Sequence, residues 1–261
     1  MDAVKNNPGF QRAVHAIRLG IRQEGVKEWN YTAGLVDAQG KRGRMTDREK
    51  QAAAQWACEM EIWDRCISST ERTSQYDVNH RFPMPFKEEV LNRTRDINLE
   101  AAYVYGLIRQ ESRFVINARS SVGASGLMQV MPRTAKWTAK KIGLKNFQPD
   151  QLNQRDTNIA IGTGYLKLVL DNFHGSMPMA AAAYNAGPSR PRKWRNGPML
   201  EGAIWTECIP FTETRDYVKK VLSNTTAYAA LITGEPQSLK ARLGKIGPRE
   251  KSEPEDDNEL P

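Results

Sequence analysis

Hydrophobic residues recur along most of this chain at spacings of three and four positions, which is the period of an amphipathic α-helix. Near the N-terminus, Phe10, Val14, Ile17 and Ile21 fall on one face of an expected helix. No segment shows sustained alternation of hydrophobic and polar residues, so at most a small hairpin is expected near residues 120–129. The pattern therefore predicts a mainly α fold.

A helical hairpin is predicted before residue 70. Thr46 followed three positions later by Glu49 is a capping-box pattern, which opens a helix that we expect to run through Ala57. Tryptophans also serve as ligand platforms, but at helical spacing they are more often core, so we predict paired antiparallel helices of a helical array. The hydrophobic stripe that joins the two helices consists of Trp56, Met60, Trp63 and Ile67.

The segment 81–86 interrupts the helical pattern, because its two prolines cannot lie inside a helix. We interpret it as a hinge, after which a second domain begins near Lys87. The end of the chain is acidic, contains proline and lacks aromatic residues, which is typical of disorder. The predicted organisation is a helical segment over 1–86, a larger domain over 87–236 and a disordered tail, basic and then acidic, over 237–261.

The larger domain is also predicted to be helical. Pro132 suits the first turn of a helix that stops at Gly143, and Gly234 suits the stop of the last helix. The expected helices span 100–110, 132–143, about 157–173, a short stretch before Tyr184, and 213–232.

The 261 residues carry a formal charge of +8, so the surface should attract polyanions. Nucleic acid is not indicated, because the basic residues are scattered and no recognised nucleic-acid motif accompanies them. Solubility explains a dispersed excess of cations equally well. No stretch approaches the roughly 18 apolar residues of a membrane span. The first residues also lack the apolar core of a signal peptide.

The three cysteines, Cys58, Cys66 and Cys208, show no metal-ligand spacing. No other cluster suggests a metal, so neither a metal nor a cofactor is expected. Cys58 and Cys66 lie eight positions apart in the predicted hairpin, where a disulfide is open to them. We nevertheless expect buried free thiols.

Glu111 is the strongest candidate for chemistry. It lies on the apolar stripe of its expected helix, seven positions beyond Val104. A carboxylate on a buried face is costly unless it is paired or protonated. Desolvation raises its pKa, and a general acid needs a raised pKa to be protonated near neutral pH. The alternative is a structural carboxylate held by Arg109 or Arg113.

Four short motifs follow one another in a characteristic order. They are Glu-Ser at 111–112, Gly-Leu-Met-Gln-Val-Met-Pro at 126–132, Ala-Ala-Tyr-Asn-Ala-Gly-Pro at 182–188 and Ile-Pro-Phe-Thr-Glu-Thr-Arg-Asp-Tyr-Val at 209–218. Together they resemble the soluble lytic transglycosylases, whose catalytic domain has a goose-type lysozyme fold. The resemblance is nearly continuous over residues 88–234, and the helices before residue 70 resemble the linker helices that precede that domain.

The resemblance implies a role for each motif residue. Glu111 would be the catalytic acid, the hydroxyl of Tyr184 would approach its carboxyl, and Tyr217 would border it. For Glu213, which would contact the substrate, a helix start that favours an acidic residue is a serious competing explanation. The implied substrate-binding residues are Ser112, Ser120, Gln129, Met131, Tyr184, Asn185, Glu213 and Tyr217.

The resemblance also implies a peptidoglycan lytic transglycosylase of the periplasm. Such an enzyme cleaves the β-1,4 bond between N-acetylmuramic acid and N-acetylglucosamine. Glu111 would act first as acid and then as base, so that the C6 hydroxyl attacks C1 and leaves a 1,6-anhydro end. Its partner would be the glycan strand, and the cationic surface suits peripheral contact with the cell wall or a membrane surface. We expect a monomer, and without a signal peptide we expect a fragment of a longer protein or another export route.

Two alternatives stay open. A hydrolytic goose-type lysozyme would need a second carboxylate, for which Glu201, Glu207 and Asp216 are candidates. A non-catalytic, wall-binding helical scaffold would need no acid, and the intact Glu111 argues against it.

Overall fold

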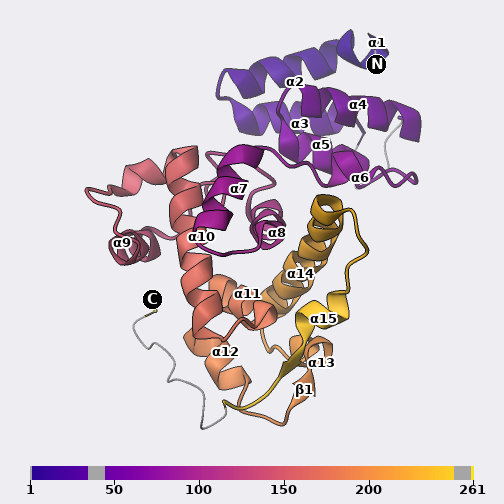
Figure 1. Ribbon diagram of the computed structural model, residues 1–261. Helices are drawn as coiled ribbons and strands as arrows, with labels where there is room; N and C mark the ends of the chain where they lie inside the picture. The colour runs from indigo at the N-terminus through magenta and orange to yellow at the C-terminus, as the bar shows by residue number, and fades with distance from the viewer. Residues whose placement is uncertain (1, 35–44, 250–259) are drawn as a thin grey trace. The chain divides into compact units, whose positions relative to one another are not determined.

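The computed structural model describes residues 2–34, 45–249 and 260–261. The chain is built almost entirely of helices and divides into two compact units (Figure 1). The first unit comprises Met1–Pro83 and the second Met84–Pro261, so the boundary falls in the proline-containing segment. None of the described helices is long and apolar enough to cross a membrane.

The first unit consists of helical hairpins in which α2 packs on α3 and α4 packs on α5. Thr46 and Glu49 form the predicted capping box at the start of α4. The prediction for Ile21 is wrong: α2 ends earlier, Gly20 turns the chain with a φ of +83°, and Ile21 is 52% exposed. The helices are α1 (Asp2–Lys5), α2 (Pro8–Arg18), α3 (Arg22–Thr32), α4 (Asp47–Glu59), α5 (Trp63–Thr70) and α6 (Val78–Arg81).

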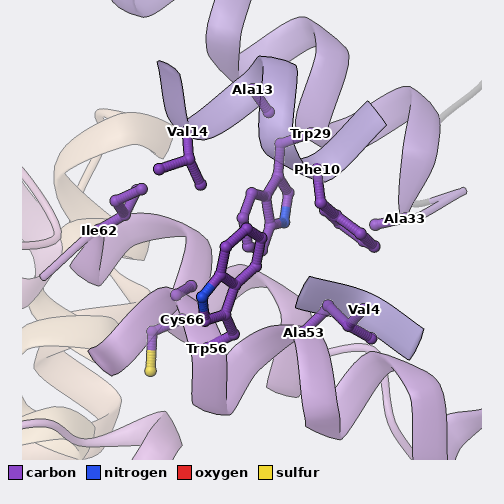
Figure 2. Packing of buried hydrophobic residues seen from close by; sticks show 11 residues of the cluster. Val4, Phe10, Ala13, Val14, Trp29, Ala33, Ala53, Trp56, Ile62 and Cys66 are labelled. Carbon is purple, nitrogen blue, oxygen red and sulfur yellow. The ribbon is translucent and has the colours of Figure 1, made fainter. Parts of the chain in front are cut away.

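Aromatic rings fill the core of this unit (Figure 2). Trp29 and Trp56 stack with their ring centroids 6.0 Å apart, and Phe10 meets the edge of Trp29 at 4.7 Å. Such pairs add about 0.5–1.5 kcal/mol each to the effect of burial alone. Trp56 is therefore a core residue, as its helical spacing predicts, while Trp63 is half-buried.

A disulfide joins Cys58 near the end of α4 to Cys66 on α5. The expectation of free thiols at these positions is wrong. The short turn between the two helices brings the Cα atoms to 5.2 Å, which lies within the range that a disulfide spans. Cys208 is a free cysteine and is exposed.

Four helices, α8, α10, α11 and α14, form the centre of the second unit. α11 contacts both α10 and α14 and lies between them (Figure 1), and α14 also packs along α8. The longer elements are α7 (Lys87–Asp96), α8 (Ala101–Glu111), α9 (Pro132–Lys141), α10 (Arg155–Asn172), α11 (Met177–Ala186) and α14 (Thr212–Thr233). The shorter ones are the 3-10 helix η1 (Pro149–Asn153), α12 (Ser189–Trp194), β1 (Leu200–Glu201), α13 (Gly202–Glu207), α15 (Leu239–Leu243) and β2 (Lys245–Ile246).

The close approach of α8 to α14 depends on Gly106. A Cβ atom at this position would overlap the side chain of Thr225 on α14. Asn224, beside it, accepts a 3.1 Å hydrogen bond from Arg109 and donates a 3.5 Å bond to the carbonyl of Gly106. The absence of a side chain at Gly106 therefore lets the two helices approach closely, and the hydrogen bonds of Asn224 join them.

The prediction of a disordered tail from residue 237 is wrong for its first part. Leu239–Leu243 form α15, and Lys245–Ile246 form β2, which pairs antiparallel with β1. Two-residue strands leave no alternating pattern in a sequence, so this pairing could not be predicted. Residues 250–259 lie outside the described residues, but Leu260 is buried and the carbonyl of Pro261 accepts a hydrogen bond from Tyr165.

Candidate active site

Glu111 is the last residue of α8, and every residue of this helix from Ala102 to Ile108 is buried. The chain leaves the helix through Arg113 and Phe114, both with left-handed backbone, and Phe114 is buried. Glu111 itself keeps partial exposure to solvent. The acid is thus fixed at the end of a buried helix, where it can still meet a ligand.

Tyr217 on α14 donates a hydrogen bond to Oε1 of Glu111, with 2.6 Å between the oxygens. The tyrosine is only 5% exposed, and Val218 and Val221 are buried on the same helix. Its ring is held by the core, so the hydroxyl is aimed at the acid before any ligand arrives. The structure places Tyr217 against Glu111, and its role in catalysis stays a prediction.

The pKa of Glu111 is raised from 4.5 to about 7. Loss of hydration is the main cause, because burial disfavours the charged carboxylate. The hydrogen bond from Tyr217 acts in the opposite direction, and the negative charge of Glu213 raises the pKa further. A carboxyl with this pKa gains and loses a proton near neutral pH, as a group that acts as both acid and base requires.

A pocket of about 290 Å³ lies at Glu111. Four of its residues come from one face of α14, where positions three and four apart lie side by side. Gln110 and Glu111 from α8 and Asn185 from α11 complete the lining. The residues from α14 are Glu213, Asp216, Tyr217 and Lys220.

Ser112 fastens the neighbouring glycine-rich segment to the end of α8. Its hydroxyl donates a 2.7 Å hydrogen bond to the carbonyl of Leu127. Within the segment, Ser120 accepts a 2.9 Å bond from the amide of Ala124 and so closes a turn. The predicted small hairpin amounts to two isolated β-bridges, both of which involve Ser125.

Gln129 and Met131 follow in the same segment. The Gln129 amide donates to the carbonyls of Ala118 and Gly126 at 3.0 and 2.8 Å, and its backbone is left-handed. Met131 is 41% exposed and immediately precedes α9. Of these two, Met131 presents its side chain to solvent, while Gln129 uses its amide nitrogen within the protein.

Asn158 on α10 is fully buried and forms hydrogen bonds with the glycine-rich segment. It accepts a 2.8 Å bond from the amide of Met128 and donates 2.9 Å bonds to the carbonyls of Ser125 and Leu152. A Cβ atom on Gly126 would overlap the Asn158 side chain. Sequence reasoning missed Asn158, because nothing in its local pattern points to a turn 30 residues away.

The short helix predicted before Tyr184 extends through Tyr184 and Asn185: α11 ends at Ala186, and Gly187, the residue expected to stop it, follows with a φ of +84°. The hydroxyl of Tyr184 donates a 2.8 Å bond to the carbonyl of Met128. Burial, together with the negative charge of Glu111, raises the pKa of Tyr184 well above its ordinary value. The Asn185 oxygen accepts a 2.7 Å bond from Thr214 at the start of α14.

The structure separates the candidate acids. Asp216 lines the pocket, as does Glu213. Glu207 pairs with Lys219 and Glu201 pairs with Lys245, and neither is among the residues that line this pocket. Arg109, a candidate partner for a structural Glu111, donates a 3.1 Å hydrogen bond to Asn224.

Of the residues predicted to bind substrate, the pocket brings together Asn185, Glu213 and Tyr217 around Glu111. Gln110 and Lys220 were not predicted. Lys220 lies three positions after Tyr217 and seven after Glu213, so a helical projection of 213–220 is the signal that would have found it.

Two family models match the domain that carries Glu111 and its pocket. Residues 90–202 match the family model of the Transglycosylase SLT domain, and residues 208–237 match that of the Soluble lytic transglycosylase helical domain. The chain belongs to the soluble lytic transglycosylase family. The predicted family and fold class are therefore confirmed.

Individual relatives extend the likeness beyond the matched domain. The soluble lytic murein transglycosylase of Salmonella typhimurium is 34% identical over 241 residues, covering 91% of this chain and 36% of that protein. A solved lytic transglycosylase from Pseudomonas aeruginosa, an inactive Glu-to-Gln mutant, is 33% identical with a TM-score of 0.82, covering 94% of this chain and 39% of the other.

A third relative was solved with a ligand. This 70-kDa soluble lytic transglycosylase, in complex with bulgecin A, is 30% identical with a TM-score of 0.77, and the match covers 91% of this chain and 37% of the other. The chain thus spans little more than a third of the length of these relatives.

Proposed function

We propose that this chain is a peptidoglycan lytic transglycosylase that cleaves the β-1,4 bond between N-acetylmuramic acid and N-acetylglucosamine. The observation that carries the proposal is the state of Glu111. Its carboxyl lies in a pocket, accepts a 2.6 Å hydrogen bond from Tyr217 and has a pKa of about 7. Family membership supplies the substrate class, since the relatives are named murein transglycosylases.

In the first step, protonated Glu111 donates its proton to the glycosidic oxygen, and the bond to C1 of the muramic acid breaks. The developing positive charge lies next to the newly formed carboxylate. In the second step, that carboxylate takes the proton of the C6 hydroxyl, and the C6 oxygen bonds to C1. The result is a 1,6-anhydro end without consumption of water, and Glu111 is protonated again.

A pKa near 7 serves both steps, because a general acid or base works best when its pKa is close to the operating pH. Tyr217 stabilises the carboxylate between the two transfers, since a hydrogen bond to the charged form favours that form. Tyr217 itself stays protonated, because burial and the nearby charge of Glu111 raise its pKa well above its ordinary value.

For the substrate, we propose direct contacts with Asn185 and Glu213 in the pocket and with the exposed thioether of Met131. Ser112, Ser120, Gln129 and Tyr184 hold backbone groups of the cleft segment, which supports a positioning role. Contact of these four residues with the sugar stays a prediction.

We place this activity in the periplasm. Murein lies outside the cytoplasmic membrane, and the Cys58–Cys66 disulfide suits an oxidising compartment.

The test is to digest purified peptidoglycan and to analyse the sugar ends by mass spectrometry. Anhydro ends support the proposal. Reducing ends would instead indicate a hydrolytic lysozyme, for which Asp216 and Glu213 are the pocket carboxylates available. The Glu111→Gln variant is the control, and products released equally by this variant would contradict the assigned role of Glu111.

A further inference from the structure

Two adjacent lysines on α14 have different surroundings. The ammonium group of Lys219 lies 3.1 Å from a carboxylate oxygen of Glu207 and 3.4 Å from one of Asp216. Lys220 lines the pocket at Glu111, is exposed, and forms no ion pair within the part of the chain that the structure describes. The charge of Lys219 is thus neutralised by carboxylates of the protein, while the charge of Lys220 lies at the pocket.

The pocket around Lys220 is otherwise acidic. Glu111, Glu213 and Asp216 line it, and Lys220 is the cation among its lining residues. The nearest acid on the helix is Asp216, four positions earlier, and Lys219 already offsets its charge. A neutral sugar needs no cation for recognition, whereas an anionic ligand entering beside Glu213 would be repelled without one.

We propose that Lys220 binds a carboxylate of the glycan strand and so determines the preference of the enzyme for anionic substrates. This inference rests on the proposed function, because that function supplies the substrate. Peptidoglycan offers the carboxylate in two places: on the lactyl group of muramic acid where the peptide has been removed, and on the stem peptide where it is present.

The bound carboxylate lies close to the reacting sugar. Lys220 follows Tyr217 by three positions, less than one turn of helix, and Tyr217 touches Glu111. An ammonium group on a flexible stem accepts a carboxylate from many directions, so recognition depends on charge more than on geometry. Arginine at this position should therefore retain most of the binding.

Binding is measured best in the Glu111→Gln background, in which the strand stays intact. Three ligands separate the possibilities: peptide-free strands with lactyl carboxylates, strands with stem peptides, and neutral chitooligosaccharides. Lys220→Met should weaken binding of at least one anionic ligand by roughly two- to fivefold, a range typical of one exposed ion pair. The ligand that is weakened identifies the source of the carboxylate.

Lys219→Met is the matched control, since it removes the same charge one position away. We expect this variant to bind all three ligands as the parent does, and Lys220→Arg to restore affinity for the anionic ligand. In the enzyme with Glu111 intact, Lys220→Met should raise KM and leave kcat unchanged.

Equal binding of both anionic ligands by the Lys220→Met and Lys219→Met proteins overturns the inference. So does an equal loss for the chitooligosaccharide, because Lys220 would then shape the pocket rather than bind a charge. Anhydro products from the parent enzyme together with either result would leave the proposed function standing and remove only this inference.

Discussion

The hydroxyl of Tyr217 lies 2.6 Å from Oε1 of Glu111 and joins two residues that are 106 positions apart in the sequence. One belongs to α14 and the other ends α8, so the bond ties the candidate acid to the longest helix among the described residues. The proton affinity of the acid is thereby linked to the packing of these two helices.

Replacing Glu111 by Gln should increase stability at high pH. The native pKa of about 7 exceeds the ordinary value of 4.5, so the native state binds the proton more tightly than the unfolded state does. The resulting stability is complete below pH 4.5 and is lost as the pH rises through 7. Because glutamine does not ionise, the variant does not lose stability in this pH range.

We therefore expect the free energy of unfolding of Glu111→Gln to match that of the parent at pH 4 and to exceed it at pH 8 by up to about 3 kcal/mol. Denaturant titrations at both pH values measure this difference. A difference between the two proteins that does not depend on pH would show that Glu111 is not held in a protonated state.

Two substitutions should move the pH dependence of activity in opposite directions. Tyr217→Phe removes a bond that stabilises the carboxylate, so the pKa of Glu111 rises and activity extends to higher pH. Glu213→Gln removes a negative charge that raises this pKa, so activity is lost at lower pH. Rate profiles of kcat from pH 5 to 9 measure both shifts.

The loss of stability in Tyr217→Phe should be modest, about 0.5–1.5 kcal/mol for one hydrogen bond. If the melting temperature falls while the rate profile stays as it was, Tyr217 is a core residue only. Shifts in the same direction for both variants would contradict the electrostatic account.

The glycines at 123 and 126 offer a matched pair. Both have positive φ, +96° and +81°, so an alanine at either position costs about 1–2 kcal/mol of backbone strain. At Gly123 a Cβ atom meets open space, whereas at Gly126 it overlaps Asn158. Gly126→Ala should therefore reduce the unfolding free energy well beyond Gly123→Ala, and it should reduce activity as well. Equal melting temperatures of the two variants would show that the contact with Asn158 does not make position 126 more sensitive than position 123.

The second unit should be more stable on its own when its C-terminal elements are present. A fragment of residues 84–261 retains β2 and the two hydrogen bonds of 2.7 and 2.8 Å between Arg242 and Glu100. A fragment of 87–236 lacks both. We expect cooperative unfolding of the longer fragment by circular dichroism and a lower melting temperature for the shorter. Equal melting temperatures would show that residues 237–261 do not stabilise the unit.

Removal of the disulfide should affect the first unit alone. Joining residues eight positions apart restricts the unfolded chain by about 2–3 kcal/mol on the loop-entropy estimate. A protein with Cys58→Ser and Cys66→Ser should lose this stability, measured by denaturant titration of the full chain, while Cys208→Ser in the same chain changes nothing because that thiol is exposed and free. An unchanged midpoint for the double variant would contradict a structural role for the bond.

The sequence was most informative where one local rule decides the structure. The capping box of Thr46 and Glu49, the stop of α14 at Gly234 and the position of Glu111 on an apolar face each follow from neighbours within a few residues. Patterns of this kind fixed the helices and the class of fold.

It was least informative where distant segments meet. Asn158 holds a turn 30 residues away, and Lys220 differs from Lys219 only in what the fold places near each. The hydroxyl of Tyr184, which the resemblance directed toward the acid, donates to the carbonyl of Met128. Each depends on tertiary contacts that helical periodicity does not encode.

The glycine at position 106 affects the pKa of Glu111. Because it has no side chain, α8 and α14 lie close enough for the hydroxyl of Tyr217 to meet the carboxyl. A methyl group at this position, five residues before the acid, would push the two helices apart and weaken the hydrogen bond from Tyr217. The spacing between the two helices thus contributes to the pH at which Glu111 loses its proton, because it keeps the hydroxyl of Tyr217 within bonding distance of the carboxyl.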